Sequence, residues 1–242
     1  MTDLIRTSRR LARLVRAILL ARFGSEATHG PPARAAWQQV QARRMLAALE
    51  IDVKVSGRMP DGGLVVCNHL SYVDVLVIAA QGPVVFVAKS DVRKWPVIGK
   101  LLETSGTILA ERGRPLTAPA TAHCIRAALD HGMIVVLFPE GTSSDGSSVL
   151  PFKPALLQAA LDADASITPA AISYLVDGGD AARDVCYWGD AVFLPHLIHL
   201  AALKQTNAHL IIGTPVDFPG HRKQAAVRLH RETAELLERI RK

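Results

Sequence analysis

The chain of 242 residues is long enough for one α/β domain with an appendage, and its composition, 49% hydrophobic but only 5% aromatic, favours aliphatic packing between a sheet and its helices. The three cysteines are far apart and match no metal-ligand spacing, which excludes a disulfide framework and a zinc site and favours a reducing compartment. The net charge of +6 is concentrated, because residues 1–44 carry nine arginines and two acidic residues (+7), while the rest of the chain carries 19 basic and 20 acidic residues (−1).

The first predicted element is a basic amphipathic helix over residues 4–23. Its apolar side chains follow one stripe, and five arginines fall on the opposite face within an arc of roughly 120°. The stripe comprises Leu4, Leu11, Leu14, Val15, Ile18 and Leu19, and the arginines are Arg6, Arg9, Arg10, Arg13 and Arg16. Such a helix can lie on an anionic membrane, with its apolar side among the acyl chains and its arginines at the phosphates. A helix packed on its own domain, with a solvated polar face, is the alternative.

A cluster of helix breakers at residues 24–32 separates this helix from a second one over residues 35–49. We therefore expect an N-terminal membrane-associating helical segment, residues 1–50, followed by an α/β domain, residues 51–242. The sequence contains no apolar run of about 18 residues and no signal-peptide pattern, so we expect a peripheral or monotopic protein at the cytoplasmic face of a membrane. Basic charge without interleaved aromatic residues argues against a nucleic-acid partner.

From residue 51 onwards, short β-branched runs alternate with helical stretches. The expected strands are 64–67, 84–88, 107–110, 134–138, 167–172 and 209–212, and the expected helices are 72–80, 95–102, 117–130, 153–162, 193–203 and 220–241. This alternation predicts a mostly parallel, mixed sheet of about seven strands covered by helices on both faces. Ligand-binding groups are then expected at the carboxyl ends of the strands.

The first candidate site follows the expected strand 64–67, in the sequence NHLSYVD, Asn68 to Asp74. Ser71 is placed to cap the next helix, and Asp74 occupies the capping-box position. Because His69 precedes that helix and Asp74 lies in its first turn, a bend between them can bring the carboxylate onto the imidazole. A carboxylate on Nδ1 would fix the tautomer and leave Nε2 free as a general base. Capping alone is the alternative role for Asp74.

Two further motifs follow expected strands. LFPEGTSS, residues 137–144, combines a tight turn with hydroxyls and main-chain N–H groups suited to a phosphate or a polar head group. GTILAER, residues 106–112, ends on an arginine whose planar fork matches phosphate oxygens. Taken singly, each has a plainer explanation as an exposed turn or a surface charge.

The order of NHLSYVD, GTILAER, FPEGTSS and ITPAAI strongly resembles the four sequence blocks of the glycerolipid acyltransferase family, whose best-known bacterial members are the 1-acyl-sn-glycerol-3-phosphate (lysophosphatidic acid) acyltransferases. The similarity runs from about Ile51 to Ser173. It implies that His69 is the general base and Asp74 its partner. The substrate-binding residues that it implies are Asn68, Gly106, Arg112, Pro139, Glu140, Gly141, Thr142, Lys153 and Pro169. It implies neither a metal nor a cofactor beyond the co-substrate, acyl-CoA or acyl-carrier protein.

The resemblance predicts an O-acyltransferase that moves a fatty acyl group onto the free hydroxyl of a lysophospholipid, with 1-acylglycerol-3-phosphate as the first candidate acceptor. The segment CYWGD, residues 186–190, is similar to a bacterial subset that includes lyso-ornithine lipid acyltransferase-like proteins, so another lysolipid is the alternative. A noncatalytic membrane lipid-binding protein and a thioester hydrolase are the alternatives from other classes. The sequence lacks a G-x-S-x-G elbow and Cys67 ends a strand expected to be buried, so we expect direct transfer without an enzyme nucleophile.

Overall fold

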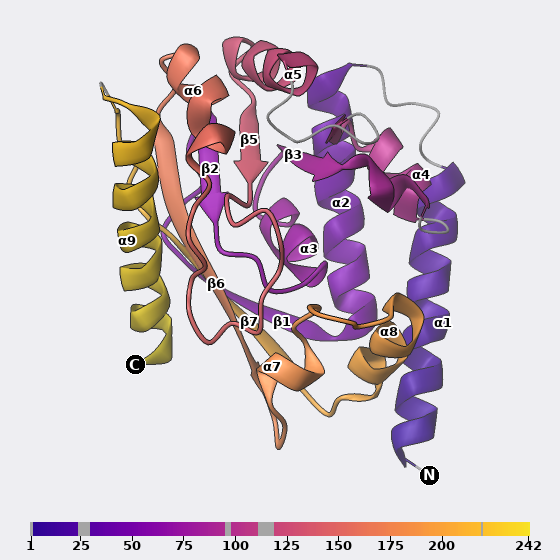
Figure 1. The fold of residues 1–242 in the computed structure, drawn as a ribbon. Coiled ribbons are helices and arrows are strands. Elements are labelled where there is room, and N and C mark those ends of the chain that lie inside the picture. The colour runs from indigo at the N-terminus through magenta and orange to yellow at the C-terminus, as the bar shows by residue number, and fades with distance from the viewer. Residues whose placement is uncertain (1, 24–29, 95–97, 111–118, 219) are drawn as a thin grey trace.

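A computed structural model describes residues 2–23, 30–94, 98–110, 119–218 and 220–242, with a seven-stranded sheet at its centre (Figure 1). The strands are β1 (Ile51–Ser56), β2 (Gly63–Cys67), β3 (Val84–Lys89), β4 (Ile108–Ala110), β5 (Ile134–Leu137), β6 (Ile167–Val176) and β7 (Thr206–Ile212). Their order is β1-β7-β6-β2-β5-β3-β4, and all neighbours are parallel except the antiparallel pair β6 and β7. The predicted mixed, mostly parallel sheet is confirmed.

Three strands differ from the sequence prediction by three residues or more, and one of them is β7, which begins at Thr206 instead of residue 209. β1 is absent from the expected strands; it lies at the edge of the sheet and buries only Ile51, so its apolar signal is weak. β6 continues to Val176 instead of ending at Ile172, because β7 pairs with it from Ala170 to Val176. All three differences follow from the pairing of β7 with β1 and β6, which a local pattern does not reveal.

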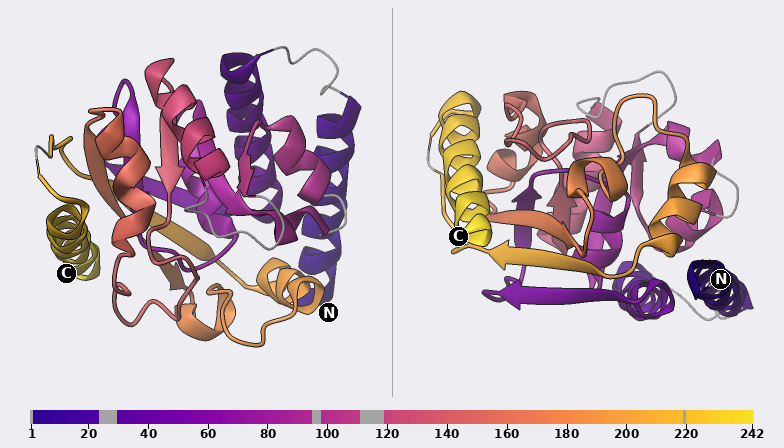
Figure 2. Two further views of the ribbon diagram at one scale, coloured as in Figure 1. Left: turned by 45° about the horizontal axis from the view of Figure 1, so that its top comes forward. Right: turned by 90° about the horizontal axis from the view of Figure 1, so that it is seen from below.

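Helices cover both faces of the sheet, as predicted (Figure 2). The helices α2 (Pro31–Leu49), α3 (Val73–Ala79) and α8 (Phe193–Ala202) contribute to one hydrophobic core, and α5 (Pro119–Asp130), α6 (Gln158–Asp162) and α9 (Arg222–Arg241) contribute to the other. Strand β2 shows the division, because Val65 and Cys67 belong to the first core and Leu64 and Val66 to the second.

The shorter elements are η2 (Ser90–Lys94), α4 (Ile98–Thr104), η3 (Pro154–Leu157) and α7 (Ala181–Asp184). The expected helix 153–162 therefore divides into a 3₁₀ turn and α6, and α7 is absent from the prediction. Among the described helices, none is both long enough and apolar enough to cross a bilayer.

The first helix, α1 (Thr2–Phe23), packs beside α2 and α8. Leu14 joins the first core, and Arg10 is only 2% exposed. The Arg10 guanidinium donates to the Glu50 carboxylate at 3.0 Å and to the carbonyl oxygen of Leu203 at 2.5 Å. Arg9 and Arg13 bind the same Glu50 carboxylate at 2.8 and 2.7 Å.

The packing of α1 on the domain is the alternative that the sequence left open. The arginine face lies partly against the protein, because the acidic Glu50 at the end of α2 offers a partner for three of the five arginines. The predicted apolar stripe divides between the core, which takes Leu14, and the surface, where Val15 and Leu19 are exposed. Periodicity identifies an amphipathic helix but not the direction in which its faces point.

Candidate active site

The candidate site lies where the carboxyl ends of β2 and β5 meet. Val66 pairs with Leu137 in the parallel register of these strands, so the residues after one strand lie beside those after the other. The imidazole of His69 stacks on the ring of Phe138, with centroids 4.1 Å apart and planes inclined by 15°. Two motifs that are distant in the sequence thus form one site.

The predicted pair of His69 and Asp74 is formed. Nδ1 of His69 lies 2.8 Å from Oδ2 of Asp74. The Asp74 side chain is fully buried, whereas the His69 side chain is 22% exposed. The contact occupies Nδ1, so the neutral ring can present Nε2 as the acceptor of a proton.

The Asp74 carboxylate has four polar neighbours. Oδ2 also accepts from the main-chain N–H groups of Leu70 and Ser71, at 2.7 and 2.9 Å, and Oδ1 accepts from the Tyr174 hydroxyl at 2.6 Å. Asp74 therefore both orients His69 and holds the main chain of the loop before α3. The expected cap at Ser71 is wrong, because Tyr72 is the N-cap position and the Ser71 hydroxyl has no partner there.

The second loop fixes the main chain of His69 from both sides. Its N–H donates to Oε1 of Glu140 at 3.2 Å, and its carbonyl oxygen accepts from the N–H of Ser144 at 3.0 Å. These bonds hold the imidazole over Phe138 without using its ring nitrogens.

Glu140 is a buried carboxyl beside this pair. Desolvation raises the pKa of Glu140 to about 8; the N–H of His69 opposes that rise and the negative charge of Asp74 adds to it. Burial, followed by the charges of Asp74 and Glu140, also raises the pKa of the Cys67 thiol well above its usual range. Cys67 is therefore a protonated, inert thiol rather than a nucleophile.

Gly141 lies between two lysines. Its φ of +70° favours glycine, and a Cβ at this position would lie 2.6 Å from Nζ of Lys153. Nζ of Lys89, at the end of β3, donates to the carbonyl oxygen of Gly141 at 3.2 Å. The two exposed ammonium groups converge on one turn, which can attract an anionic ligand.

The side-chain amide of Asn68 makes two hydrogen bonds to β6, and its oxygen also accepts from the Cys67 thiol at 3.6 Å. Its amide donates to the carbonyl oxygen of Ile172 at 3.0 Å and accepts from the N–H of Ile172 at 2.8 Å, so it ties the loop after β2 to β6. Pro139 is buried in the second loop, and Thr142 is exposed there. Pro169 is buried in β6 opposite Val66. Their contacts with substrate stay predictions.

Two predicted site residues come from the third motif. Gly106 lies between α4 and β4 with φ +76°, a conformation that ends the helix, and it does not lie at the carboxyl end of a strand. Arg112 lies outside the described residues. The proposed substrate contacts of both stay predictions.

Tyr174 and Phe138 are site residues that the sequence reasoning missed. Phe138 belongs to a recognised motif, but its stacking on His69 depends on the pairing of β2 with β5. For Tyr174 the available signal was a tyrosine in an otherwise aliphatic run, because a buried phenol usually finds a hydrogen-bond partner.

Comparison with known proteins identifies a family for the chain. Residues 50–173 match the acyltransferase family. Lyso-ornithine lipid O-acyltransferase of Pseudomonas aeruginosa is 34% identical over 194 residues, 77% of this chain and 74% of that protein. The 1-acyl-sn-glycerol-3-phosphate acyltransferase of Neisseria meningitidis is 34% identical over 158 residues, 60% of this chain and 62% of that protein.

The fold has a counterpart in a crystal structure. The 1-acyl-sn-glycerophosphate acyltransferase PlsC from Thermotoga maritima has a TM-score of 0.73 over 99% of this chain and 96% of its own, at 20% sequence identity. At that identity the likeness concerns the fold alone, and the family assignment comes from the sequence match. The chain belongs to the acyltransferase family.

Proposed function

We propose that the chain transfers a fatty acyl group from acyl-CoA or acyl-carrier protein to the free hydroxyl of a lysophospholipid, with His69 as general base. The observation that carries the proposal is the 2.8 Å contact between Nδ1 of His69 and the buried Asp74 carboxylate, on a ring that still reaches solvent. This arrangement orients the imidazole through Nδ1 and leaves Nε2 available for a proton.

The chemistry is a direct transfer. Nε2 of His69 takes the proton of the acceptor hydroxyl as its oxygen attacks the thioester carbonyl carbon. The new C–O bond forms, the C–S bond breaks, and the imidazolium returns the proton to the leaving thiolate. Asp74 stabilises the imidazolium while it exists.

We propose 1-acylglycerol-3-phosphate as the acceptor, which would give phosphatidic acid. The support is the pair of lysines, Lys89 and Lys153, at the turn around Gly141, since a phosphate monoester carries the charge that two ammonium groups attract. The Neisseria relative bears a name that specifies this acceptor.

Lyso-ornithine lipid is the second candidate acceptor. The segment 186–190, absent from the general family blocks, contacts both loops of the site. The N–H of Tyr187 donates to the carbonyl oxygen of Leu70 at 2.7 Å, and the Cys186 thiol donates to the carbonyl oxygen of Asp145 at 3.4 Å. Relatives named for this acceptor match 77% of the chain at 34% identity in Pseudomonas aeruginosa and 79% at 33% in Rhizobium meliloti.

We also propose that the protein works at the cytoplasmic face of a membrane as a peripheral or monotopic protein. A lysolipid acceptor resides in a bilayer, and large apolar side chains are exposed on two adjoining helices. On α1 they are Leu4, Ile5, Val15, Leu19 and Leu20, and on α8 and its N-cap they are Val192, Leu194 and Ile198.

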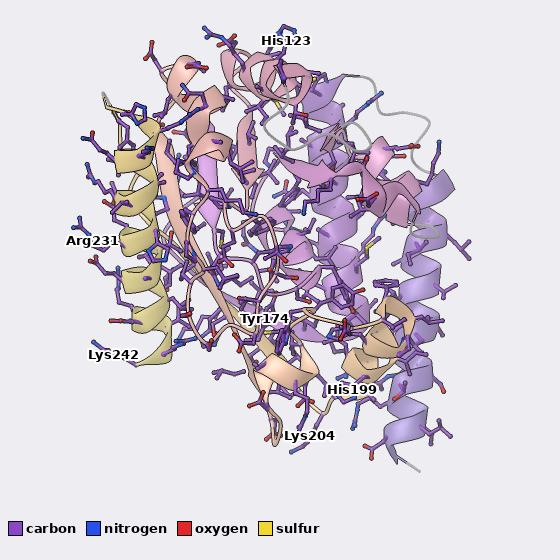
Figure 3. All side chains as sticks on the ribbon, viewed as in Figure 1. His123, Tyr174, His199, Lys204, Arg231 and Lys242 are labelled. Carbon is purple, nitrogen blue, oxygen red and sulfur yellow. The ribbon has the colours of Figure 1, made fainter. Side chains whose placement is uncertain are left out.

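The test is a matrix of acyl-CoA and acyl-carrier-protein donors against lysophosphatidic acid and lyso-ornithine lipid, with mass spectrometry of the lipid product. His69→Ala should lower turnover by at least about a hundredfold, because it removes the general base. The control is His123→Ala, whose imidazole is exposed on α5 far from the site (Figure 3).

Three results would contradict the proposal. The first is full acylation by folded His69→Ala protein. The second is thiol release that does not depend on acceptor, which would indicate a hydrolase. The third is lipid binding without thiol release from any donor, which would indicate a noncatalytic lipid-binding protein.

A further inference from the structure

The carboxylate that orients His69 receives a hydrogen bond from a residue outside all four recognised sequence blocks. The hydroxyl of Tyr174 donates to Oδ1 of Asp74 at 2.6 Å, the shortest of the bonds to this carboxylate. Tyr174 is 2% exposed and Asp74 is fully buried, so water does not compete for the contact. Figure 3 shows Tyr174 inside the molecule, near α7.

The two oxygens of Asp74 have different partners. Oδ2 faces the His69 ring and the main-chain N–H groups of Leu70 and Ser71, all close in sequence. Oδ1 faces Tyr174, which belongs to β6, and β6 flanks β2 on the side opposite to β5. Tyr174 is itself fixed by the ladder to Ala208 of β7. The bond to Oδ1 therefore sets the rotation of the carboxylate about its Cβ–Cγ bond from a rigid part of the sheet.

We propose that Tyr174 is a positioning residue for acyl transfer: its hydroxyl holds the Asp74 carboxylate in the plane that His69 requires and takes up part of its negative charge. This proposal rests on the proposed function. A charge-assisted bond of this length, removed from water, is among the stronger hydrogen bonds in proteins.

Other ionisable groups surround the carboxylate. The thiols of Cys67 and Cys186 and the carboxyl of Glu140 all lie near enough to interact with its charge. Burial raises the pKa of Cys67 well above its usual range, that of Cys186 to about 12, and that of Tyr174 well above 10, so these groups stay protonated in the working range. Glu140, with a pKa of about 8, titrates within that range and needs its own control.

The test compares Tyr174→Phe with Thr233→Val. Each change deletes a buried side-chain hydroxyl, but Thr233 lies on α9, outside the candidate site and its motifs. Without the Tyr174 hydroxyl, more negative charge remains on the Asp74 carboxylate, and that charge stabilises the protonated His69 ring. We expect kcat/KM near neutral pH to fall about tenfold and the acidic limb of its pH profile to move up by about one unit, while Thr233→Val leaves both unchanged.

Two further measurements distinguish an effect of Tyr174 on His69 from the titration of Glu140 and from a loss of packing. Glu140→Gln identifies any part of the profile that belongs to Glu140. An NMR titration of the His69 ring in wild-type and Tyr174→Phe protein measures the effect of Tyr174 on the imidazole without catalysis. We expect the transition of the ring signals at higher pH in the variant.

An equal loss of rate at every pH, with an unmoved NMR transition, would overturn the proposal and leave Tyr174 a packing residue. So would unchanged kinetics. A shifted NMR transition in a protein that acylates no lysolipid would support the role of Tyr174 toward Asp74 and refute the proposed function instead.

Discussion

His69 and Asp74 meet because the chain bends through Leu70 and Ser71 before α3 begins, and the carboxylate folds back over that bend. The two buried carboxyls of the site have different surroundings. Asp74 receives bonds from main-chain N–H groups and from a phenol, whereas Glu140 lies in a desolvated position beside that charge. One site thus holds a carboxylate suited to stabilising an imidazolium and a carboxyl that keeps its proton close to neutral pH.

The raised pKa of Glu140 predicts a pH-dependent stability. The folded protein holds the Glu140 proton up to about pH 8, whereas an unfolded glutamate has the ordinary value of 4.5, so the folded state binds the extra proton between these values. The contribution of Glu140 to stability is therefore complete below about pH 4.5 and declines as pH rises through about 8. Glu140→Gln should melt close to wild type at pH 5 and above it at pH 9.

Melting temperatures by circular dichroism across this range check the prediction. Glu235→Gln removes an exposed carboxyl on α9 and serves as the control. A difference in melting temperature between wild type and Glu140→Gln that is the same at every pH would show that Glu140 does not retain its proton.

At the scale of elements, α1 is attached to the domain by Arg10. This side chain bridges the carboxylate of Glu50, at the end of α2, and the carbonyl oxygen of Leu203, which follows α8. Partial desolvation raises the pKa of Glu50, but Arg10, Arg9 and Arg13 outweigh it and the pKa is lowered overall. Three elements are joined by one buried guanidinium.

Arg10→Met should lower the free energy of unfolding by about 2 to 4 kcal/mol, because methionine keeps much of the volume but leaves buried carbonyl oxygens without their donor and removes one of the three arginines bound to Glu50. Arg16→Met, on the exposed part of the same helix, should stay within about 0.5 kcal/mol of wild type. Urea denaturation of both variants measures the difference. Equal values for the two would mean that Arg10 contributes no more than a surface charge.

At the scale of the whole molecule, the adjoining helices α1 and α8, which both carry exposed apolar side chains, lie at one side of the sheet, and α9 lies at the opposite side (Figure 1). Val15 and Leu19 of α1 are 54% and 49% exposed, and Val227 of α9 is 73% exposed. If the exposed apolar side chains of α1 and α8 contact lipid, the membrane binds on the side of α1 and not on the side of α9.

Replacing both Val15 and Leu19 with Ser should weaken binding to vesicles of phosphatidylglycerol and phosphatidylethanolamine by about tenfold or more, since each removes apolar surface from the lipid contact. Val227→Ser is the matched control, with a similarly exposed side chain on the opposite helix. Co-sedimentation gives the bound fraction. Equal binding by the double variant and the control would place the membrane contact elsewhere.

The sequence alone determined the class of fold and the pairing of His69 with Asp74. These two conclusions follow from short-range information, because a strand, the loop after it and the first turn of a helix are contiguous in the chain. The assignment of Glu140 and Gly141 to the same site came from the resemblance of the four sequence blocks to a known family. The cap expected at Ser71 was wrong, and the pairing of the α1 arginines with Glu50 was not predicted, since each depends on what lies across the fold.

Only the tertiary structure decided how distant segments meet. The placement of β2 between β5 and β6 brings Phe138 and Glu140, which follow β5, to His69. It also brings Asn68 to Ile172 of β6, and Asp74 to Tyr174 of the same strand. The extension of β6 to Val176 depends on β7, and without it Tyr174 would have no fixed position. Strand order and register depend on the burial of the whole chain at once, so the spacing of residues along the sequence does not specify them.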